Sequence, residues 1–553
     1  MIEFLTANIA PLMFGAMVLL LLLGYPVAFS LAACGVIFGL IGIKLGLLQA
    51  TLFQALPERI WGIMSNDTLL AIPFFTLMGL ILERSGMAED LLDTIGQLFG
   101  PIRGGLAFAV IFVGAMLAAT TGVVAASVIS MGLISLPIMM RYGYDRRIAS
   151  GVIAASGTLA QIIPPSLVLI VMADQLGRSV GDMYKGAFIP GFVLTGLYVG
   201  FIVLLAIFRP KWVPALPIEA RTIREDDGSA GLRSLSVLTV LSVGAAWAFA
   251  RWRPSETPTD ELIVTAMSVG VGVAFVLSVF DKLLRLGWLS RMAQKVTFVL
   301  IPPLGLIFLV LGTIFLGVAT PTEGGAMGAT GALLMAVMRG RLNFKLLGQA
   351  VETTAKLTAF VVFILVGARV FSLTFYGVDG HRWVEHLLLD LPGGQIGFLI
   401  VVNLLVFVLA FFLDFFELAF IIVPLLGPVA DKLGIDLIWF GVLLAVNMQT
   451  SFMHPPFGFS LFFLRSVAPP EVKTTEIYWG AIPFVIIQLI MVVLVIAFPQ
   501  LVTASLDRRD VVDIEKVQIV VPEMEDAGDP YGDIKPNGSF PVPSEDPAAS
   551  FKR

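Results

Sequence analysis

The chain has 553 residues, of which 58% are hydrophobic and only 14% are charged, and its mean hydropathy is +0.94. Soluble globular proteins carry about 25% charged residues, so this composition excludes a soluble protein and predicts an all-α protein that crosses a membrane several times. The net charge of −5 decides little, because the charges gather in loops and in the carboxyl-terminal tail. The single cysteine, Cys34, lies in an apolar run and excludes disulfide bonds within the chain.

Apolar runs follow one another along the chain, and spanning a bilayer takes about 20 apolar residues. The amino terminus lacks the basic region and the small-residue cleavage site of a signal peptide, so we expect the first run to be a retained span. Several runs are too short to span alone, and we expect these to be half-helices or hairpin arms. The runs lie near 9–24, 27–43, 68–82, 105–118, 123–140, 148–173, 187–208, 234–250, 262–280, 296–318, 325–338, 354–375, 396–413, 415–430, 437–463 and 479–499.

Lysine and arginine are enriched in cytoplasmic loops, which gives a rule for orientation. One crossing scheme places all four basic clusters of the chain in the cytoplasm and the amino terminus outside. In this scheme 234–250 and 262–280 form a helical pair, and the loop at 376–394 lies on the outer side of the membrane. The clusters are Arg141, Arg146 and Arg147; Arg209, Lys211, Arg221 and Arg224; Lys282, Arg285, Arg291 and Lys295; and Arg339, Arg341 and Lys345.

Two Pro-Pro pairs in apolar runs mark an internal repeat. Placing Pro164-Pro165 on Pro455-Pro456 gives an offset of 291 residues (455 − 164), and about 29 residues then align without a gap in the pattern P-x5-G-[YI]-D-x18-P-P. The orientation scheme puts 141–147 inside and the matching 432–436 outside, so we expect the two halves to be inverted. Interrupted helices at matching positions of inverted halves are typical of the binding sites of secondary transporters.

Each proline pair is expected to end a half-helix near the middle of the membrane, because proline removes a backbone donor and breaks the helix. The freed backbone groups would line a small polar cavity that binds an ion or a substrate, since irregular backbone is tolerated there. A structural kink in a buried helix is the alternative. Polar residues beside the first pair are Ser156, Gly157, Thr158 and Gln161, and those beside the second are Asn447, Gln449, Thr450, Ser451 and His454.

Hard cations such as sodium prefer oxygen ligands, which these side chains and the backbone supply. Small hydroxyl residues also help helices to pack, so packing remains the alternative for each of them. Two other polar interruptions are expected to be the tips of re-entrant hairpins. They lie at Thr120, Thr121 and Gly122, and at Asp414, with Glu417 on the same helical face as Asp414.

Acidic residues inside membrane segments are costly and indicate function. Besides Asp414 and Glu417, Glu323 lies between apolar runs, and each of these acids could bind a cation, carry a proton or pair with a base such as Arg369. A structural ion pair or a helix-end carboxylate is the alternative. Asn66 and Asp67 are expected to cap the helix that follows them.

Several stretches together resemble the large membrane subunit of TRAP transporters, the tripartite ATP-independent periplasmic carriers. Any one of them alone would be unspecific, but they extend over most of the chain outside 210–295 and the tail. The stretches are "NDTLLAIPFFTLMGLILERSGMAEDLL", "ISLPIMMRYGYDRRIASGVIAASGTLAQIIPPSLVLI", "GAFIPGF", "GVATPTEGGAMGA" and "PVADKLGIDLIWFGVLLAVNMQTSFMHPPFGFSLFF".

The resemblance implies an elevator-type carrier of the bacterial inner membrane, with a scaffold and a mobile transport domain built from two hairpins and two broken helices. It implies sodium-driven uptake of organic anions, no other cofactor, and two partners: a small four-helix membrane subunit and a periplasmic substrate-binding protein. One sodium set would come from Thr121, Gly122, Ser156, Gly157 and the residues before Pro164. The other would come from Gly317, Thr320 and Thr322 with Asn447 and Thr450.

The chain also departs from the common family pattern. Thr121-Gly122-Val123 stands where Ser-Gly-Ser is usual, "FFLDFFELAF" lacks the usual proline, and 210–295 adds a helical pair. These features resemble the longer mannitol/chloroaromatic subgroup, which includes carriers of 2-oxo acids and lactate. They therefore weaken the case for assigning to this chain the sialic-acid or C4-dicarboxylate specificity of other family members.

The resulting interpretation is an inverted-repeat transporter rather than an enzyme. The alternatives are a stand-alone ion-coupled carboxylate carrier, a channel subunit and, remotely, an intramembrane enzyme, since His381 and His386 do not match H-E-x-x-H. The expected parts are scaffold helices (1–59), the first repeat (60–208), an inserted helical pair (209–295), a scaffold segment with "TPTE" (296–349), the second repeat (350–500) and a disordered tail (501–553).

Overall fold

The computed structural model of the chain describes residues 2–121, 124–223, 225, 231–254, 259–455 and 458–506. Within these ranges the regular structure is helical throughout, as the composition predicts. Eight described helices are long and apolar enough to cross a membrane, and two further bent helix pairs raise that number to ten if each pair is one span. The tail from residue 507 onward, which the sequence predicts to be disordered, lies outside the described residues.

The amino-terminal helices pack on a long helix from the second half of the chain. Helix α3 packs along α16. A Cβ atom on Gly35 of α3 would lie 2.7 Å from the Val370 carbonyl oxygen of α16, so only glycine allows this close approach. The helices are α1 (Ile2–Ala7), α2 (Ile9–Leu22), α3 (Val27–Lys44), η1 (Ala50–Ala55), α4 (Leu56–Met64) and α16 (Phe344–Gly377).

The first half contains a hairpin and a broken helix, as expected. Arms α7 and α8 pack against each other and against α9, and the break at the first proline pair separates α9 and η3 from α10. The chain also bends by 45° between α4 and α5. The Asn66 side chain caps the segment after that bend by accepting from the Thr68 N–H at 2.9 Å, which confirms the predicted cap. The elements are η2 (Asp67–Leu70), α5 (Ala71–Arg84), α6 (Met87–Phe99), α7 (Gly105–Thr121), α8 (Val124–Arg141), α9 (Arg146–Thr158), η3 (Leu159–Gln161), α10 (Leu167–Leu176) and α11 (Val180–Phe208).

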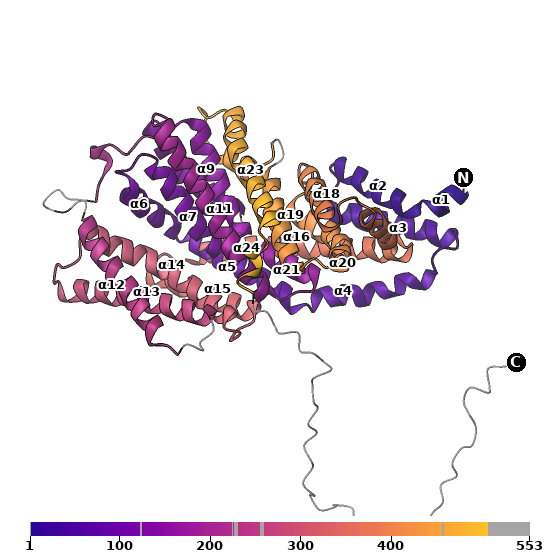
Figure 1. Cartoon of the computed structure of the whole chain (residues 1–553), viewed down its shortest axis with the longest axis horizontal. Helices are drawn as coiled ribbons and strands as arrows, with labels where there is room; N and C mark the ends of the chain where they lie inside the picture. The colour runs from indigo at the N-terminus through magenta and orange to yellow at the C-terminus, as the bar shows by residue number, and fades with distance from the viewer. Residues whose placement is uncertain are drawn as a thin grey trace, which may run out of the picture. The chain divides into compact units, whose positions relative to one another are not determined.

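The inserted segment forms the predicted helical pair. Helices α12 and α13 pack against each other and onto α14, and Figure 1 shows the three as neighbours. A third Pro-Pro pair, Pro302 and Pro303, lies inside α14 without ending it, so two adjacent prolines alone do not predict a break. The elements are η4 (Ile218–Ala220), α12 (Leu232–Trp252), α13 (Thr259–Leu284), α14 (Arg291–Phe315) and α15 (Pro321–Met338).

The second half repeats the order of the first: a short helix, two hairpin arms, a broken helix and a long helix. The prediction of a loop at 376–394 is wrong in part, because this segment contains helix α17, which buries Val384 and Leu388 on one face. Only one face of such a helix is apolar, so its mean hydropathy is too low for a search for apolar runs to find it. Helix α6 is missed for the same reason. The elements are α17 (Gly380–Leu389), α18 (Gly394–Leu409), α19 (Phe415–Glu417), η5 (Leu418–Ile422), α20 (Val423–Lys432), α21 (Leu437–Met448), η6 (Gln449–Phe452), α22 (Phe459–Val467), α23 (Thr474–Ala497) and α24 (Gln500–Thr503).

Helix ends in the two halves follow the 291-residue offset. Helix α8 ends at Arg141 and α20 ends at Lys432, and a glycine with positive φ follows two residues later in each half. Asp145 and Asp436 then cap α9 and α21 by accepting backbone N–H groups with their carboxylates. The inverted orientation of the two halves remains a prediction.

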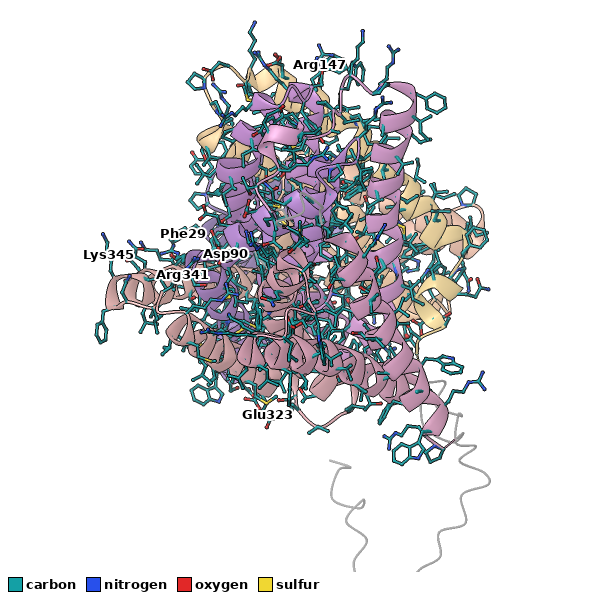
Figure 2. All side chains as sticks on the ribbon, turned by 90° about the vertical axis from the view of Figure 1, so that its left-hand side faces the viewer. Phe29, Asp90, Arg147, Glu323, Arg341 and Lys345 are labelled. Atoms are coloured by element: carbon teal, nitrogen blue, oxygen red, sulfur yellow. The ribbon has the colours of Figure 1, made fainter. Side chains whose placement is uncertain are left out.

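Two of the basic clusters pair with one element, α6. Asp93 of α6 pairs with Lys295 at 2.7 Å, and Asp90 pairs with Arg339 and Arg341 at 3.0 and 3.3 Å. Figure 2 shows Asp90 and Arg341 beside each other. The segment after α11 joins the same face, since Trp212 accepts from the N–H of Asp145 at 3.0 Å and Thr222 donates its N–H to Gln97. The ion pairs of α6 support placing the third and fourth clusters on the same side of the membrane, while the placement of all four there stays a prediction.

Replacing Asp436 by alanine removes the carboxylate that accepts the Trp439 N–H at 2.7 Å. We expect Asp436→Ala to lower the free energy of unfolding by about 1 kcal/mol, the usual effect of losing a helix cap. The control is Asp390→Ala, which removes an exposed carboxylate that makes no described side-chain hydrogen bond. Thermal unfolding in detergent measures both variants, and equal melting temperatures would contradict the role of the cap.

Candidate functional site

The two broken helices meet at the centre of the described chain. The Gln449 side chain, in η6 of the second half, donates from Nε2 to the Thr158 carbonyl at 2.8 Å. The two residues are 291 positions apart, so they are equivalent residues of the two halves. Equivalent residues can touch only near the axis that relates the halves, which places this contact at the centre of the repeat.

The first break is enclosed by the arms of the first hairpin. Ser156 faces α7, where a Cβ atom on Gly114 would lie 2.6 Å from the Ser156 Cβ, and Gly157 faces the Val128 side chain of α8. Ser156 and Thr158 are fully buried, and their hydroxyls donate to carbonyls one turn back on α9. The structure thus packs Ser156 and Gly157 against the hairpin arms, and their predicted role as sodium ligands stays a prediction.

Other predicted residues of the first site have varied placements. Gln161 is 2% exposed and Pro164 lies in the buried segment between η3 and α10. Thr120 and Thr121 form the end of α7 in the backbone, and Gly122 lies outside the described residues. The sodium set that includes Thr121 and Gly122 thus stays a prediction.

The second break carries the same kind of buried polar groups. The Asn447 amide donates to the Asn403 carbonyl at 2.7 Å and to the Asn403 side-chain oxygen at 3.0 Å, which ties α21 to the hairpin arm α18. The Thr450 and Ser451 hydroxyls donate to carbonyls three residues back, at 2.7 Å each. His454 is 2% exposed and stacks on Phe411 with 4.0 Å between ring centroids.

Four buried amide oxygens near the breaks accept no hydrogen bond from the described residues: those of Gln161, Asn447, Gln449 and Gln488. A buried oxygen without a partner costs about 1–3 kcal/mol, so native proteins rarely leave several together. The NH₂ groups of Asn447, Gln449 and Gln488 are used as donors, which leaves the oxygens free to face a cation or a water. This donor set fits sodium, which takes neutral oxygen ligands.

The stretch "TPTE" lies elsewhere. Thr320 caps α15 and forms a capping box with Glu323. Of the alternatives for Glu323, the structure therefore shows a carboxylate that caps a helix end. The Thr322 hydroxyl donates to the Asp67 carbonyl at 2.6 Å, which joins α15 to η2 of the first half. Gly317 lies in the preceding turn with φ +67°.

Hydrogen bonds of the described residues do not join Gly317, Thr320 or Thr322 to the second break. Those of Asn447 and Thr450 go to Asn403 and to their own helix. The predicted sodium set of Gly317, Thr320, Asn447 and Thr450 therefore remains untested, and the structure offers Asn403 as a nearer partner of Asn447.

Asp414 and Glu417 stand at the tip of the second hairpin. They form a capping box in which each side chain accepts the other's N–H at 2.9 Å. Both line a cavity of about 290 Å³ together with Ser451 of the second break and four phenylalanines. The ion pairs of the described chain do not include Arg369 with either acid, so that predicted pairing is absent from this structure.

Sequence reasoning missed three polar residues of this centre: Asn403, Gln488 and Tyr198. Gln488 of α23 donates to the Tyr198 hydroxyl at 3.0 Å and to the Thr158 hydroxyl at 3.3 Å. Asn403 and Gln488 are each a lone amide in an apolar run, which is the signal that could have found them.

The polar groups of this centre are mainly amides, hydroxyls and backbone carbonyls. In the described part of the chain, His, Cys, Asp and Glu form no group of three or more that could hold a metal ion. The centre offers amide, hydroxyl and backbone oxygens, which suit a hard monovalent cation.

Comparison with known proteins adds the family. A profile of the family "Tripartite ATP-independent periplasmic transporter, DctM component" matches residues 14–501. The C4-dicarboxylate TRAP transporter large permease DctM of Pseudomonas aeruginosa is 27% identical over 447 residues, which cover 81% of this chain and 88% of that protein. Its Vibrio cholerae counterpart is 27% identical over 511 residues, covering 88% and 95%.

Among solved structures, the YdaH transporter of Alcanivorax borkumensis aligns with a TM-score of 0.48 and 16% identity, covering 82% of this chain and 90% of that one. Members of the matched family are transporter permeases and not enzymes. The chain belongs to the DctM family of tripartite ATP-independent periplasmic transporters, as a large permease that crosses the bacterial inner membrane several times.

Proposed function

We propose that the chain is the permease of a sodium-coupled, binding-protein-dependent uptake system for a small organic anion. The substrate class is a carboxylate such as a 2-oxo acid, lactate or a dicarboxylate. The partners are the small four-helix membrane subunit and a periplasmic substrate-binding protein. A stand-alone ion-coupled carrier is the second candidate, because the central site lies entirely within this chain.

The observation that carries the proposal is the pair of broken helices with free amide oxygens between them. Helices interrupted at equivalent places give a site that two conformations can open in turn. Buried oxygens without donors give that site an affinity for a small cation, and bound cations can in turn offset the charge of a carboxylate substrate.

The mobile unit would contain the two hairpins and the two broken helices. In each half a hairpin arm packs on the broken helix, α7 on α9 and α18 on α21. Helices α3 and α16 would belong to the scaffold. Relative movement of these parts is the elevator mechanism that we propose for the chain.

Sodium should stabilise the purified chain with its small membrane partner in detergent. A ligand that binds only the folded state adds about 2.7 kcal/mol at a hundredfold excess over Kd, so the melting temperature should rise in sodium chloride. Potassium and choline chloride at equal ionic strength are the controls. Equal melting temperatures in all three salts would reject sodium coupling.

Ser156→Ala, Asn447→Ala and Thr450→Ala should each raise the sodium Kd at least about tenfold, because one oxygen ligand on a cation is worth more than about 1.4 kcal/mol. The matched control is Ser150→Ala, which removes a buried hydroxyl bonded within α9 but away from the break. Sodium titrations of the melting temperature measure the affinities. Unchanged sodium affinity in all three variants would show that the site assignment is wrong.

Asp414→Asn and Glu417→Gln test whether charge at the second hairpin matters. Both replacements keep side-chain oxygens that can serve the capping box, so we expect nearly unchanged stability. If the charges help to hold a cation, uptake by proteoliposomes with the binding protein should fall at least about tenfold. Uptake at the unsubstituted rate in both variants would leave the two acids as helix caps. Omitting the binding protein separates the two candidate functions, since only a stand-alone carrier keeps its activity.

A further inference from the structure

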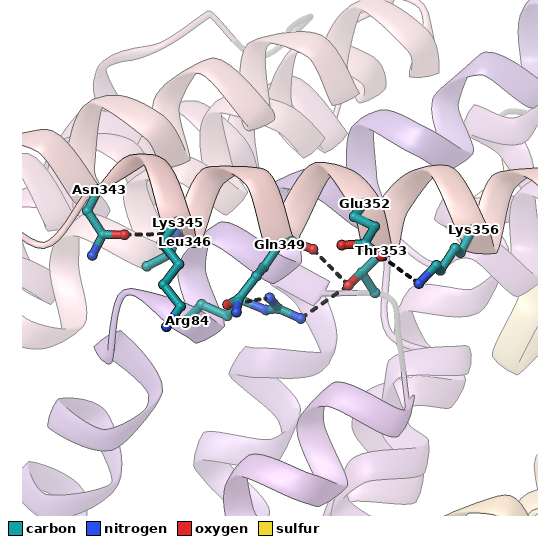
Figure 3. Close-up of a pocket in the computed structure, with 8 residues that line it drawn as sticks. All are labelled: Arg84, Asn343, Lys345, Leu346, Gln349, Glu352, Thr353 and Lys356. Atoms are coloured by element: carbon teal, nitrogen blue, oxygen red, sulfur yellow. Dashed lines mark hydrogen bonds and ion pairs between the residues drawn. The ribbon is translucent and has the colours of Figure 1, made fainter.

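The first turns of α16 carry a polar stripe that faces an open pocket of about 640 Å³. Figure 3 shows its side chains and Arg84, from the last turn of α5, around the same space. The stripe follows the helical repeat, because its members are three or four residues apart. It consists of Lys345, Gln349, Glu352, Thr353 and Lys356.

The pocket is positively charged. Arg84, Lys345 and Lys356 face one acid, Glu352, which is paired with Lys356 at 2.6 Å. The Arg84 guanidinium donates to two neutral acceptors, the Gln349 side-chain oxygen at 3.2 Å and the Thr353 hydroxyl at 3.1 Å, so these bonds leave its charge uncancelled.

The opposite face of the same turns is apolar. Phe344 is 94% exposed and Val351 is 49% exposed. Gln349 and Val351 lie two residues apart and therefore on opposite sides of the helix. This helix thus has one face that suits lipid and another that suits water.

The polar stripe leads along α16 toward the tip of the second hairpin. Phe360 lies one turn after Lys356, and its ring contacts that of Phe416 with 6.3 Å between centroids. Phe416 precedes Glu417, which lines the 290 Å³ cavity described above. From Lys345 to Lys356 the helix rises about 16 Å, so the stripe extends over several turns.

We propose that this basic pocket is the cytoplasmic vestibule through which the organic anion leaves the central site. The proposal rests on the function proposed above. A cleft with an excess of one sign of charge concentrates ions of the opposite sign. Here three basic residues against one acid would draw the released carboxylate away from the acidic hairpin tip. The pocket adjoins the basic cluster of Arg339 and Arg341, which the orientation scheme places in the cytoplasm.

The test uses charged thiol reagents, because the chain has a single natural cysteine, Cys34, which is 1% exposed. Gln349→Cys places a thiol in the pocket, and Val351→Cys places one on the apolar face. Inside-out vesicles with the whole transporter are treated with an anionic or a cationic alkyl methanethiosulfonate. The thiolate attacks the reagent sulfur and releases methanesulfinate, and the rate is followed by mass spectrometry.

We expect the Gln349→Cys thiol to prefer the anionic reagent about tenfold more than a free thiol in solution does. Adding Lys345→Gln or Lys356→Gln should lower this preference about two- to fivefold each, as expected for one charge within a Debye length. Lys44→Gln, at the exposed end of α3, is the control and should change nothing. The Val351→Cys thiol should react slowly with both reagents.

Three results would overturn the proposal. The first is a Gln349→Cys thiol whose preference for the anionic reagent is no greater than that of a free thiol, or a preference that Lys44→Gln lowers as much as Lys345→Gln and Lys356→Gln do. The second is a thiol that reacts only in right-side-out vesicles, which places the pocket outside. The third is a thiol that both reagents reach only in detergent or without the small subunit, which means that lipid or protein fills the pocket. None of these affects the sodium-dependent melting, so failure of the vestibule and failure of sodium coupling are distinguishable.

Discussion

One hydrogen bond between equivalent residues holds the centre of this permease together. The carbonyl groups in the last turn of a helix lack partners within that helix. At the end of α9 the Thr158 carbonyl finds its donor in Gln449 of the other half, and the Thr158 hydroxyl accepts from Gln488. The second half therefore completes the backbone hydrogen bonding of the first at this point. The arrangement uses the amide nitrogens and leaves the amide oxygens without a donor among the described residues, which is the basis of the cation site that we propose.

The proline pairs are only part of the reason for the breaks. Pro302 and Pro303 leave α14 helical, whereas α9 and α21 tighten into 3-10 turns several residues before their prolines. The first turn carries Gln161 and the second carries Gln449, Thr450 and Ser451. Gln449 finds its partner in the opposite half, at the Thr158 carbonyl. Proline thus makes continuation of the helix costly, while the surrounding polar groups decide whether a break is tolerated inside a membrane protein.

Features that depend on local chemistry could be predicted from the sequence. Long apolar runs predict the spans, the local sequence predicts Asn66 as a helix cap, and the offset of 291 residues identifies the equivalent breaks. Asp145 and Asp436 belong to the repeat pattern, and the structure adds that both are helix caps. Amphipathic helices α6 and α17 were missed, because their mean hydropathy is moderate. The pairings of Asn447 with Asn403 and of Gln488 with Thr158 join residues far apart in sequence, so only the folded chain brings them together. Glu323 could be read as an intramembrane acid or as a cap, and the capping box decides between the two.

The length of α16 has a geometric consequence. Its 34 residues extend about 51 Å, while the hydrocarbon core of a bilayer is about 30 Å thick. Even at a tilt of about 40°, the upper end of the usual range, the helix would still span about 39 Å along the membrane normal. About 9 Å or more must therefore stand clear of the hydrocarbon. The first four turns are the end that can do so, because they carry Lys345, Glu352 and Lys356. Helix α16 would then extend from the hydrocarbon core into the headgroup layer.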